Sequence, residues 1–353
     1  MTLNLSQFDY SLPKHLIAQK PVSPRDRSRL LVLNRNTGSI NHKSFFEIRN
    51  ALGKNDVLVM NNTKVFPARV MAKDIRGRDT EFLLTKKLRG RTWEALRRGK
   101  VRVNDVFNFA GVNFKVSENK GETVVIEFPI SSESLFQKLY LKGVTPLPPY
   151  IQPSKKEHEI RKLYQTVYAK KTGSIAAPTA GFHFTGRLIK NLIQKGVQIE
   201  YVTLHVGLGT FLPIKTADIT KHHIHSESFE VDPETAKRLN KAKSLGKRLV
   251  AVGTTTTRVL ETLADQNSQF YIHNGQTDLF IYPPYKFKFV DALITNFHLP
   301  RSTLLALVST FVSTPNTTHE FQEFTDSVMG KAYAEAIQKN YRFYSFGDAM
   351  FIY

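Results

Sequence analysis

The spacing of hydrophobic and polar positions changes along the chain. Between residues 69 and 129, short runs of alternating hydrophobicity such as TEFLLT, NFKVSE and TVVIEF are separated by the turn sequences RGRD, LRGR and NKGE. Short alternating runs bounded by such turns are typical of an antiparallel sheet or a small barrel. The pattern therefore predicts a small antiparallel β-barrel domain, to which we assign residues 70–148.

A different order of elements is expected beyond residue 160, where apolar runs lead into amphipathic ones. KRLVAVGTT leads into TTRVLETLAD, and VDALITNF leads into LPRSTLLALVSTF. Strands that alternate with helices indicate a mostly parallel sheet or an α/β barrel. Because residues 44–61 also indicate a helix and then a buried strand, we assign residues 1–69 and 149–353 to the main domain. The predicted fold class is α/β, with an α/β-barrel-like main domain and an inserted small antiparallel β-barrel domain.

Polar motifs follow the predicted strands of the main domain. They are AAPTAGFHF at 176–184, HVGLGTF at 205–211, HHIHSE at 222–227, GTTTTR at 253–258 and TNFHLP at 295–300. Ligands bind at the carboxyl ends of parallel strands in α/β folds, so these motifs are expected to line one cleft. AAPTAGFHF and GTTTTR also have a purely structural interpretation as a turn and a helix cap.

Four residues in these motifs are candidate acids or bases. Histidine has a usual pKa close to neutrality, which singles out His183 and His298. In HHIHSE, residues 223, 225 and 227 would share one face of a strand. That arrangement fits an acid–base pair of His225 and Glu227, a divalent-metal site, or a solvated edge strand.

The other motif residues are candidates for substrate binding. Glycines let a ligand approach the backbone closely, and the free N–H groups at the start of a helix attract an anion. The GLG sequence lacks the third glycine and the acidic residue of a dinucleotide-binding fingerprint, so we exclude an NAD site. The candidate binding residues are Thr179, Gly181, His205, Gly207, Gly209, Thr254, Thr255, Arg258 and Asn296.

Charge narrows the class of partner. Of the 353 residues, 50 are Lys or Arg and 30 are Asp or Glu, giving a formal charge of +20. Such a charge favours a polyanionic partner, which could be nucleic acid, an acidic membrane face or a phosphorylated ligand, and charge alone does not choose among them. Twelve Lys/Arg against five Asp/Glu lie between residues 69 and 105, with aromatic residues among them. This stretch is either a solvated basic face or an RNA contact, for which the candidates are Arg97, Arg98, Lys100 and Arg102.

The chain contains no cysteine, which excludes disulfides, iron–sulfur clusters and cysteine nucleophiles. Its N-terminus has no apolar stretch of the signal-peptide type. The most apolar helical run, at 303–312, is far shorter than the roughly 20 residues that span a bilayer. We therefore expect a cytoplasmic protein that makes no membrane contact.

Taken in order, the motifs resemble those of a known family. YQTVYA, GSIAAPTAGFHFT, VTLHVGLGTF, HHIHSE, AVGTTTTRVLE, TDLFIYPPYKF, TNFHLPRSTLL and YRFYSFGDAM are similar to strings in the S-adenosylmethionine:tRNA ribosyltransferase-isomerases of queuosine biosynthesis. PRDRSRLLVL and NNTKVFPARV extend the resemblance, which runs from about Phe8 to Ile352. The chain departs from the family pattern at 160–163, where an acidic residue and a Glu-Arg pair are usual, and at Phe182, Ile224 and Pro284.

The resemblance implies an enzyme that transfers and isomerises the ribosyl part of S-adenosylmethionine. The implied acceptor is 7-aminomethyl-7-deazaguanine at the wobble position of tRNA, and the implied products are epoxyqueuosine-tRNA, adenine and methionine. No metal is implied, and a monomer is expected. For this chemistry we predict that His225 and Glu227 form the base and that His183 or His298 faces the adenine. A non-catalytic RNA-binding protein and a metal-dependent RNA hydrolase are the alternatives.

Overall fold

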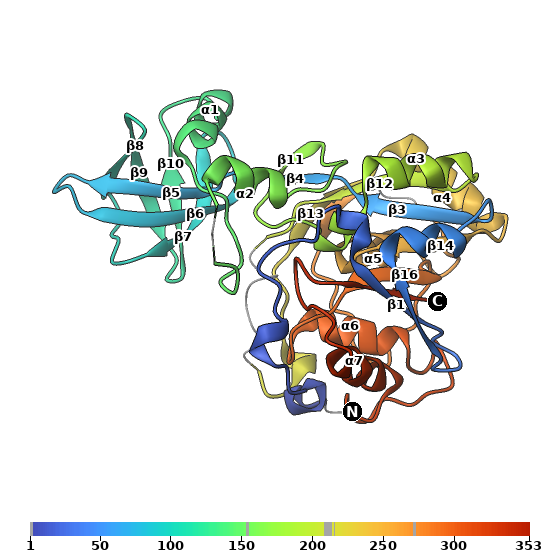
Figure 1. The fold of residues 1–353 in the computed structure, drawn as a ribbon. Coiled ribbons are helices and arrows are strands. Elements are labelled where there is room, and N and C mark those ends of the chain that lie inside the picture. The colour runs from blue at the N-terminus through green and yellow to red at the C-terminus, as the bar shows by residue number, and fades with distance from the viewer. Residues whose placement is uncertain (1–2, 153–154, 208–213, 215, 271–272) are drawn as a thin grey trace.

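The structure is a computed structural model that describes residues 3–152, 155–207, 214, 216–270 and 273–353. Figure 1 shows a small barrel on one side of a larger body in which helices cover a twisted sheet. The predicted fold class is confirmed, because an α/β main body carries a closed antiparallel barrel inserted in its sequence. The limits 70–148 of the inserted domain stay a prediction.

A mixed sheet forms the centre of the main body. Within the described residues it has nine strands, in the order β15 (Asn274–Thr277), β13 (Glu227–Glu230), β12 (Gln198–Leu204), β3 (Asp56–Asn61), β14 (Arg248–Val252), β16 (Ala292–Asn296), β17 (Ala349–Ile352), β1 (Arg29–Leu33) and β2 (Ile40–Ser44). Strands β12, β3, β14 and β16 are parallel neighbours. Their carboxyl ends therefore lie at one edge, where β17 and β1 begin, because β17 is antiparallel to β16 and parallel to β1.

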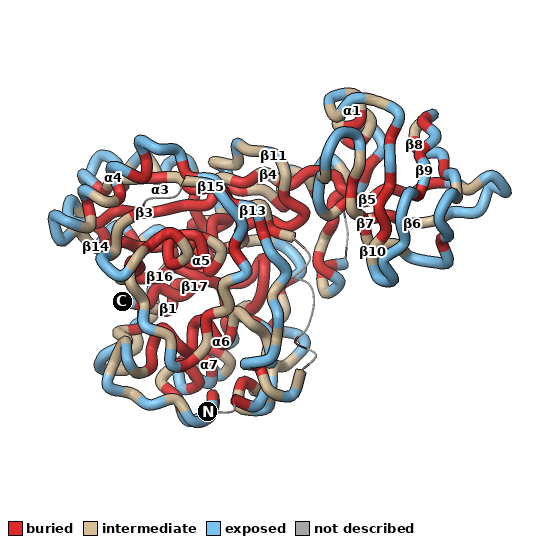
Figure 2. The backbone as a smooth tube through the Cα atoms, turned by 180° about the vertical axis from the view of Figure 1, so that it is seen from behind, coloured by how far each residue is buried: buried red, intermediate tan, exposed pale blue. Residues whose placement is uncertain are grey.

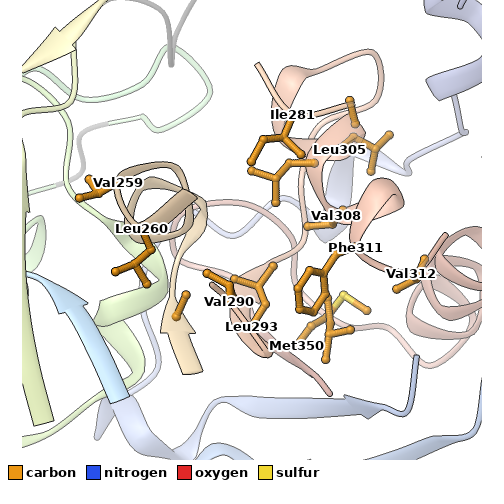
Figure 3. Packing of buried hydrophobic residues seen from close by; sticks show 14 of the residues in the cluster. Val259, Leu260, Ile281, Val290, Leu293, Leu305, Val308, Phe311, Val312 and Met350 are labelled. Carbon is orange, nitrogen blue, oxygen red and sulfur yellow. The ribbon is translucent and has the colours of Figure 1, made fainter. Parts of the chain in front are cut away.

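Side chains alternate along these strands and bury both faces of the sheet. On β3, Val57 and Val59 belong to one hydrophobic cluster, whereas Leu58 and Met60 belong to another. The first cluster is covered by α4 (Pro233–Ser244), α5 (Thr254–Leu263), α6 (Thr303–Phe311) and α7 (Val328–Gln338), and the second by α3 (Gly186–Gln194). Figure 3 shows Val259 and Leu260 of α5 and Leu305, Val308 and Phe311 of α6 in the first cluster, together with Leu293 and Met350.

Each covering helix begins at a residue that suits a helix start. The side chains of Thr185, Asp232, Ser302 and Ser327 accept backbone N–H groups in the first turns of α3, α4, α6 and α7. Helix α5 instead follows Gly253, whose φ of 90° suits glycine. A glycine at this point lets β14 turn sharply into α5 at the carboxyl edge of the sheet.

The inserted barrel has its own core. Its strands are β5 (Arg69–Asp74), β6 (Asp79–Lys87), β7 (Thr92–Arg98), β8 (Val106–Phe109), β9 (Val112–Asn119) and β10 (Thr123–Glu127), and the pairing of β9 with β10 closes it. Aromatic rings fill the interior, and α1 (Ser132–Lys142) packs Leu135 and Leu139 against it. Figure 2 shows buried residues along the barrel strands and, separately, along the main sheet.

A short helix and a two-stranded sheet join the two parts. Helix α2 (Glu157–Leu163) and the parallel pair β4 (Thr63–Val65) and β11 (Lys171–Ser174) lie between barrel and body in Figure 1. Arg161 of α2 donates to the carbonyl groups of Tyr140 and Gly143 at the end of α1. Arg25 donates to the carbonyl groups of Leu163 at 2.7 Å and Gln165 at 2.6 Å. Two arginines thus connect α2 to both parts of the molecule through backbone oxygens.

Among the helices of the described residues, none combines the length and the apolar character needed to cross a bilayer.

The replacement Phe114→Ala should destabilise the barrel. Phe114 is 1% exposed, and its ring packs against those of Phe82, Phe107 and Phe128. Truncating a buried phenylalanine typically costs about 3–5 kcal/mol. Trp93, the single tryptophan of the chain, lies in the same core. Urea unfolding followed by tryptophan emission should therefore show a lower midpoint for the variant.

Met71→Ala provides the control, because Met71 lies on β5 with 47% of its surface exposed. The midpoint of this variant should stay close to that of the wild type. A midpoint for Phe114→Ala equal to that of Met71→Ala would contradict the aromatic core described above.

Candidate functional site

Asn61, at the end of β3, connects three elements at the carboxyl edge of the sheet. Its Oδ1 accepts the backbone N–H groups of Thr63 and Leu204, each at 3.1 Å. Its Nδ2 donates to the carbonyl oxygen of Leu204 at 3.1 Å and lies 3.4 Å from the Thr255 hydroxyl. This buried amide therefore fixes the end of β12 and the first turn of α5 relative to β3.

His183 belongs to a chain of hydrogen bonds at the same edge. The Thr179 hydroxyl donates to Oδ1 of Asn296 at 2.9 Å, and Nδ2 of Asn296 lies 3.1 Å from Nε2 of His183. The other ring nitrogen, Nδ1, lies 2.7 Å from the Ser28 hydroxyl. Because the amide nitrogen can only donate, Nε2 accepts and Nδ1 carries the proton. Both ring nitrogens are thus engaged by protein groups.

Burial keeps His183 and His298 neutral. Desolvation lowers the pKa of His183 to about 3, with smaller effects of the same sign from Arg342 and Arg25. Desolvation alone lowers the pKa of His298 to about 3. Nε2 of His298 lies 2.9 Å from the Thr295 hydroxyl, and its backbone N–H donates to the Tyr333 hydroxyl at 2.9 Å. In these surroundings neither imidazole carries a second proton near pH 7.

The expected pairing of His225 with Glu227 on a strand is not formed. Strand β13 begins at Glu227, and His225 precedes it on an exposed, irregular segment. Glu227 is 3% exposed, forms an ion pair with Arg258, and accepts the N–H of Gly207 at 2.7 Å. His225 and Glu227 would share a face only if β13 began before His225, whereas it begins at Glu227. Within the described residues, no three His, Asp or Glu side chains are grouped as a metal site would require.

Arg258 is one partner of this buried ion pair, and Gly207 donates its N–H to the other partner, Glu227. Besides Glu227, the Arg258 guanidinium binds the carbonyl oxygens of Leu279 at 3.0 Å and Thr277 at 3.3 Å. Its donors are therefore used within the protein, which favours a structural role over the predicted ligand contact. The ion pair lines a small cavity with Ile224, Phe280 and other apolar residues.

The remaining predicted binding residues are placed as follows. Thr254 and Thr255 form the first turn of α5. A Cβ on Gly181 would lie 1.9 Å from the Tyr168 hydroxyl, so the Thr179–His183 turn requires glycine there. His205 directly follows β12, and its Nδ1 lies 2.8 Å from the Thr63 hydroxyl. Gly209 lies outside the described residues.

The predicted motifs thus converge only in part. Thr179, His183 and Asn296 are joined by hydrogen bonds, Asn61 connects Thr255 to the end of β12, and His205 follows that strand. Sequence reasoning did not single out Asn61, Thr63 or Ser28. The strings NNTKVFPARV and PRDRSRLLVL, which contributed to the resemblance, contain all three and were the available signal.

The basic candidates on the barrel differ in their surroundings. Arg98, Lys100 and Arg102 are exposed. The Arg97 guanidinium instead binds the carbonyl oxygens of Gly99 and, at 3.1 Å, Gly121. Arg97 therefore holds two loops of the barrel. Lys100 and Arg102 present their charges to solvent, and the exposed Arg98 lies 4.0 Å from the Glu81 carboxylate.

Comparisons with known proteins identify the family of the chain. The family model described as "Queuosine biosynthesis protein" matches residues 5–352. The chain belongs to this family.

Curated relatives match over their full length. The chain is 48% identical to the S-adenosylmethionine:tRNA ribosyltransferase-isomerase of Thermotoga petrophila and 45% identical to that of Clostridium kluyveri. In both comparisons the match covers 99% of this chain and 100% of the relative. The crystal structure of S-adenosylmethionine tRNA ribosyltransferase from Thermotoga maritima is 38% identical and gives a TM-score of 0.56, with 99% of this chain and 100% of that chain covered.

The buried histidines should make stability fall in mild acid. A histidine with a native pKa of about 3 and an unfolded pKa near 6.5 binds more protons in the unfolded state between these values. The free energy of unfolding therefore decreases as pH drops from about 6.5 towards 3. His298→Gln removes one such group, so its loss of stability between pH 7 and pH 5 in urea titrations should be smaller than that of the wild type.

His15→Gln is the matched control, because His15 is exposed. Its stability should fall between pH 7 and pH 5 as steeply as that of the wild type. A His298→Gln protein with the wild-type pH dependence would show that His298 is protonated to the same extent in the folded and unfolded states.

Proposed function

We propose that this chain transfers and isomerises the ribosyl part of S-adenosylmethionine onto 7-aminomethyl-7-deazaguanine at the wobble position of tRNA. The products would be epoxyqueuosine-tRNA, adenine and methionine. The observation that carries this proposal is full-length membership of the family, from residue 5 to 352, alongside relatives named as transferase-isomerases. As a member of this family the chain is a transferase-isomerase enzyme.

The carboxyl edge of the sheet is the proposed substrate site. S-adenosylmethionine brings its own reactivity, so the protein has to bind, orient and exchange protons. The neutral His183 and His298 carry no net charge, which suits a position beside a sugar or a base. Thr254 and Thr255 lie in the first turn of α5, where backbone N–H groups favour an anion such as the methionine carboxylate. No metal is required by these roles.

Adenine release tests the reaction directly. The purified chain, incubated with S-adenosylmethionine and tRNA carrying 7-aminomethyl-7-deazaguanine, should release adenine and methionine in equal amounts. Mass spectrometry of the tRNA nucleosides should show epoxyqueuosine, and unmodified tRNA is the control. Binding of tRNA with no adenine released would instead support a non-catalytic RNA-binding protein.

We also propose that the barrel contacts the tRNA backbone. Phosphate contacts by Lys and Arg make affinity depend strongly on salt. Changing the exposed Arg98, Lys100 and Arg102 together to Glu should weaken tRNA binding by at least about tenfold at low salt and flatten the salt dependence. Titration with labelled tRNA at several salt concentrations measures both effects, and binding of S-adenosylmethionine should be unchanged.

A matched control reverses three charges on the main body. Lys241, Lys331 and Lys339 are exposed on or next to α4 and α7. Their replacement by Glu changes the net charge equally, so it should weaken tRNA binding less than the barrel variant does. Equal losses would show that the barrel stretch acts only through the overall charge.

We further expect the protein to be cytoplasmic and monomeric.

A further inference from the structure

The ring of His205 is held in one orientation by β4. Its Nδ1 lies 2.8 Å from the Thr63 hydroxyl, which also lies 3.5 Å from the carbonyl oxygen of Lys171. A hydroxyl directed at a carbonyl oxygen donates to it and accepts from its other neighbour. When the Thr63 hydroxyl donates to that carbonyl oxygen, it accepts from Nδ1–H of His205. In that tautomer the lone pair of the ring lies on Nε2.

Strand β11 provides a flat surface for this ring. A Cβ built on Gly173 would lie 2.7 to 2.8 Å from Cε1, Nδ1 and Nε2 of His205, closer than real Cβ contacts come. Glycine at this position thus lets the imidazole pack on the backbone of β11. The backbone N–H of His205 also donates to Ser228 at 3.0 Å, so β4, β11 and β13 together fix the residue.

The free nitrogen distinguishes His205 from His183. Within the part of the chain that the structure describes, Nε2 of His205 has no hydrogen-bond partner, and the residue is only half-buried. The charged groups that face it are Lys171 of β11 and Glu230 of β13, which form an ion pair with each other. Both ring nitrogens of His183, by contrast, are bound by protein groups.

The surroundings of His205 favour its neutral form. Desolvation lowers the pKa of the imidazole, Lys171 lowers it further, and Glu230 partly opposes the shift. The neutral imidazole can accept a proton, and a fixed orientation with one nitrogen held by a neighbour is how enzymes present a general base.

We propose that His205 is the general base that takes a proton from the aminomethyl group of the acceptor, an inference that rests on the proposed function. A primary amine is largely protonated near pH 7 and has no lone pair for attack. In the step, one N–H bond of the ammonium group breaks, its electron pair stays on nitrogen, and the proton bonds to Nε2. The neutral amine is then the nucleophile, and the imidazolium returns its proton to water. Thr63 acts as a positioning residue.

The pH dependence of catalysis tests this role. We expect wild-type kcat/KM for adenine release to fall in acid, at a pH below the usual pKa of histidine, as His205 becomes protonated. His205→Ala should lower turnover by about 10²-fold or more, lose this acidic fall, and keep its affinity for tRNA. Added imidazole should restore part of the activity. Thr63→Val should lower kcat, whereas Thr63→Ser should retain it.

A nitrogen NMR measurement adds a readout that does not require activity. At neutral pH the His205 ring of the full chain should be the Nδ1–H tautomer, and in the Thr63→Val variant this preference should weaken. His15→Ala, at an exposed site, is the control and should match the wild type in every assay.

The possible failures are distinguishable. An Nε2–H tautomer, near wild-type turnover in His205→Ala, or a loss of turnover that keeps the acidic fall and resists imidazole would each overturn the role of His205 alone. A wild-type chain that releases no adenine from the complete substrates would overturn the proposed function, and the role of His205 with it.

Discussion

The buried amide of Asn61 is the interaction on which the candidate site depends. Parallel strands bring their carboxyl ends to one edge, but they do not by themselves fix the loops that follow. Asn61 does so, since one side chain binds both backbone groups of Leu204 as well as Thr63 and the first turn of α5. A buried polar group left without partners costs about 1–3 kcal/mol. The site is therefore held together by the same bonds that make burial of this amide tolerable.

The fold was largely predictable because its signals are local. A period of two with glycine turns marks the barrel, and strands that lead into helices mark the main body, so neighbouring residues carry the information. The end of the chain was harder to interpret. Within residues 341–353 the structure has the strand β17, which inserts between β16 and β1. That placement depends on pairing across more than 300 residues of sequence with β1, and no local pattern reports it.

The candidate site was predictable in its location but less so in its roles. Arg258 was singled out by its place in GTTTTR and Arg97 by its place in a basic stretch. Both nevertheless donate to carbonyl oxygens or to a buried carboxylate of the protein. His183 was singled out as a titrating group, yet its two ring nitrogens are bound and its surroundings are dry. Which donors remain free is decided by partners far away in the sequence, so the residue type cannot reveal it.

The contacts of Arg161 and Arg25 at α2, which connect the barrel to the main body, affect how the barrel sequence can diverge between relatives. Arg161 donates hydrogen bonds to the end of α1, and Arg25 donates to the end of α2, in both cases to main-chain oxygens. Main-chain oxygens are present whatever residue occupies a position. These hydrogen bonds therefore do not depend on the side chains of the residues that accept them. The outer surface of the barrel is thus free to acquire new side chains without loosening these contacts to α2 and the main body.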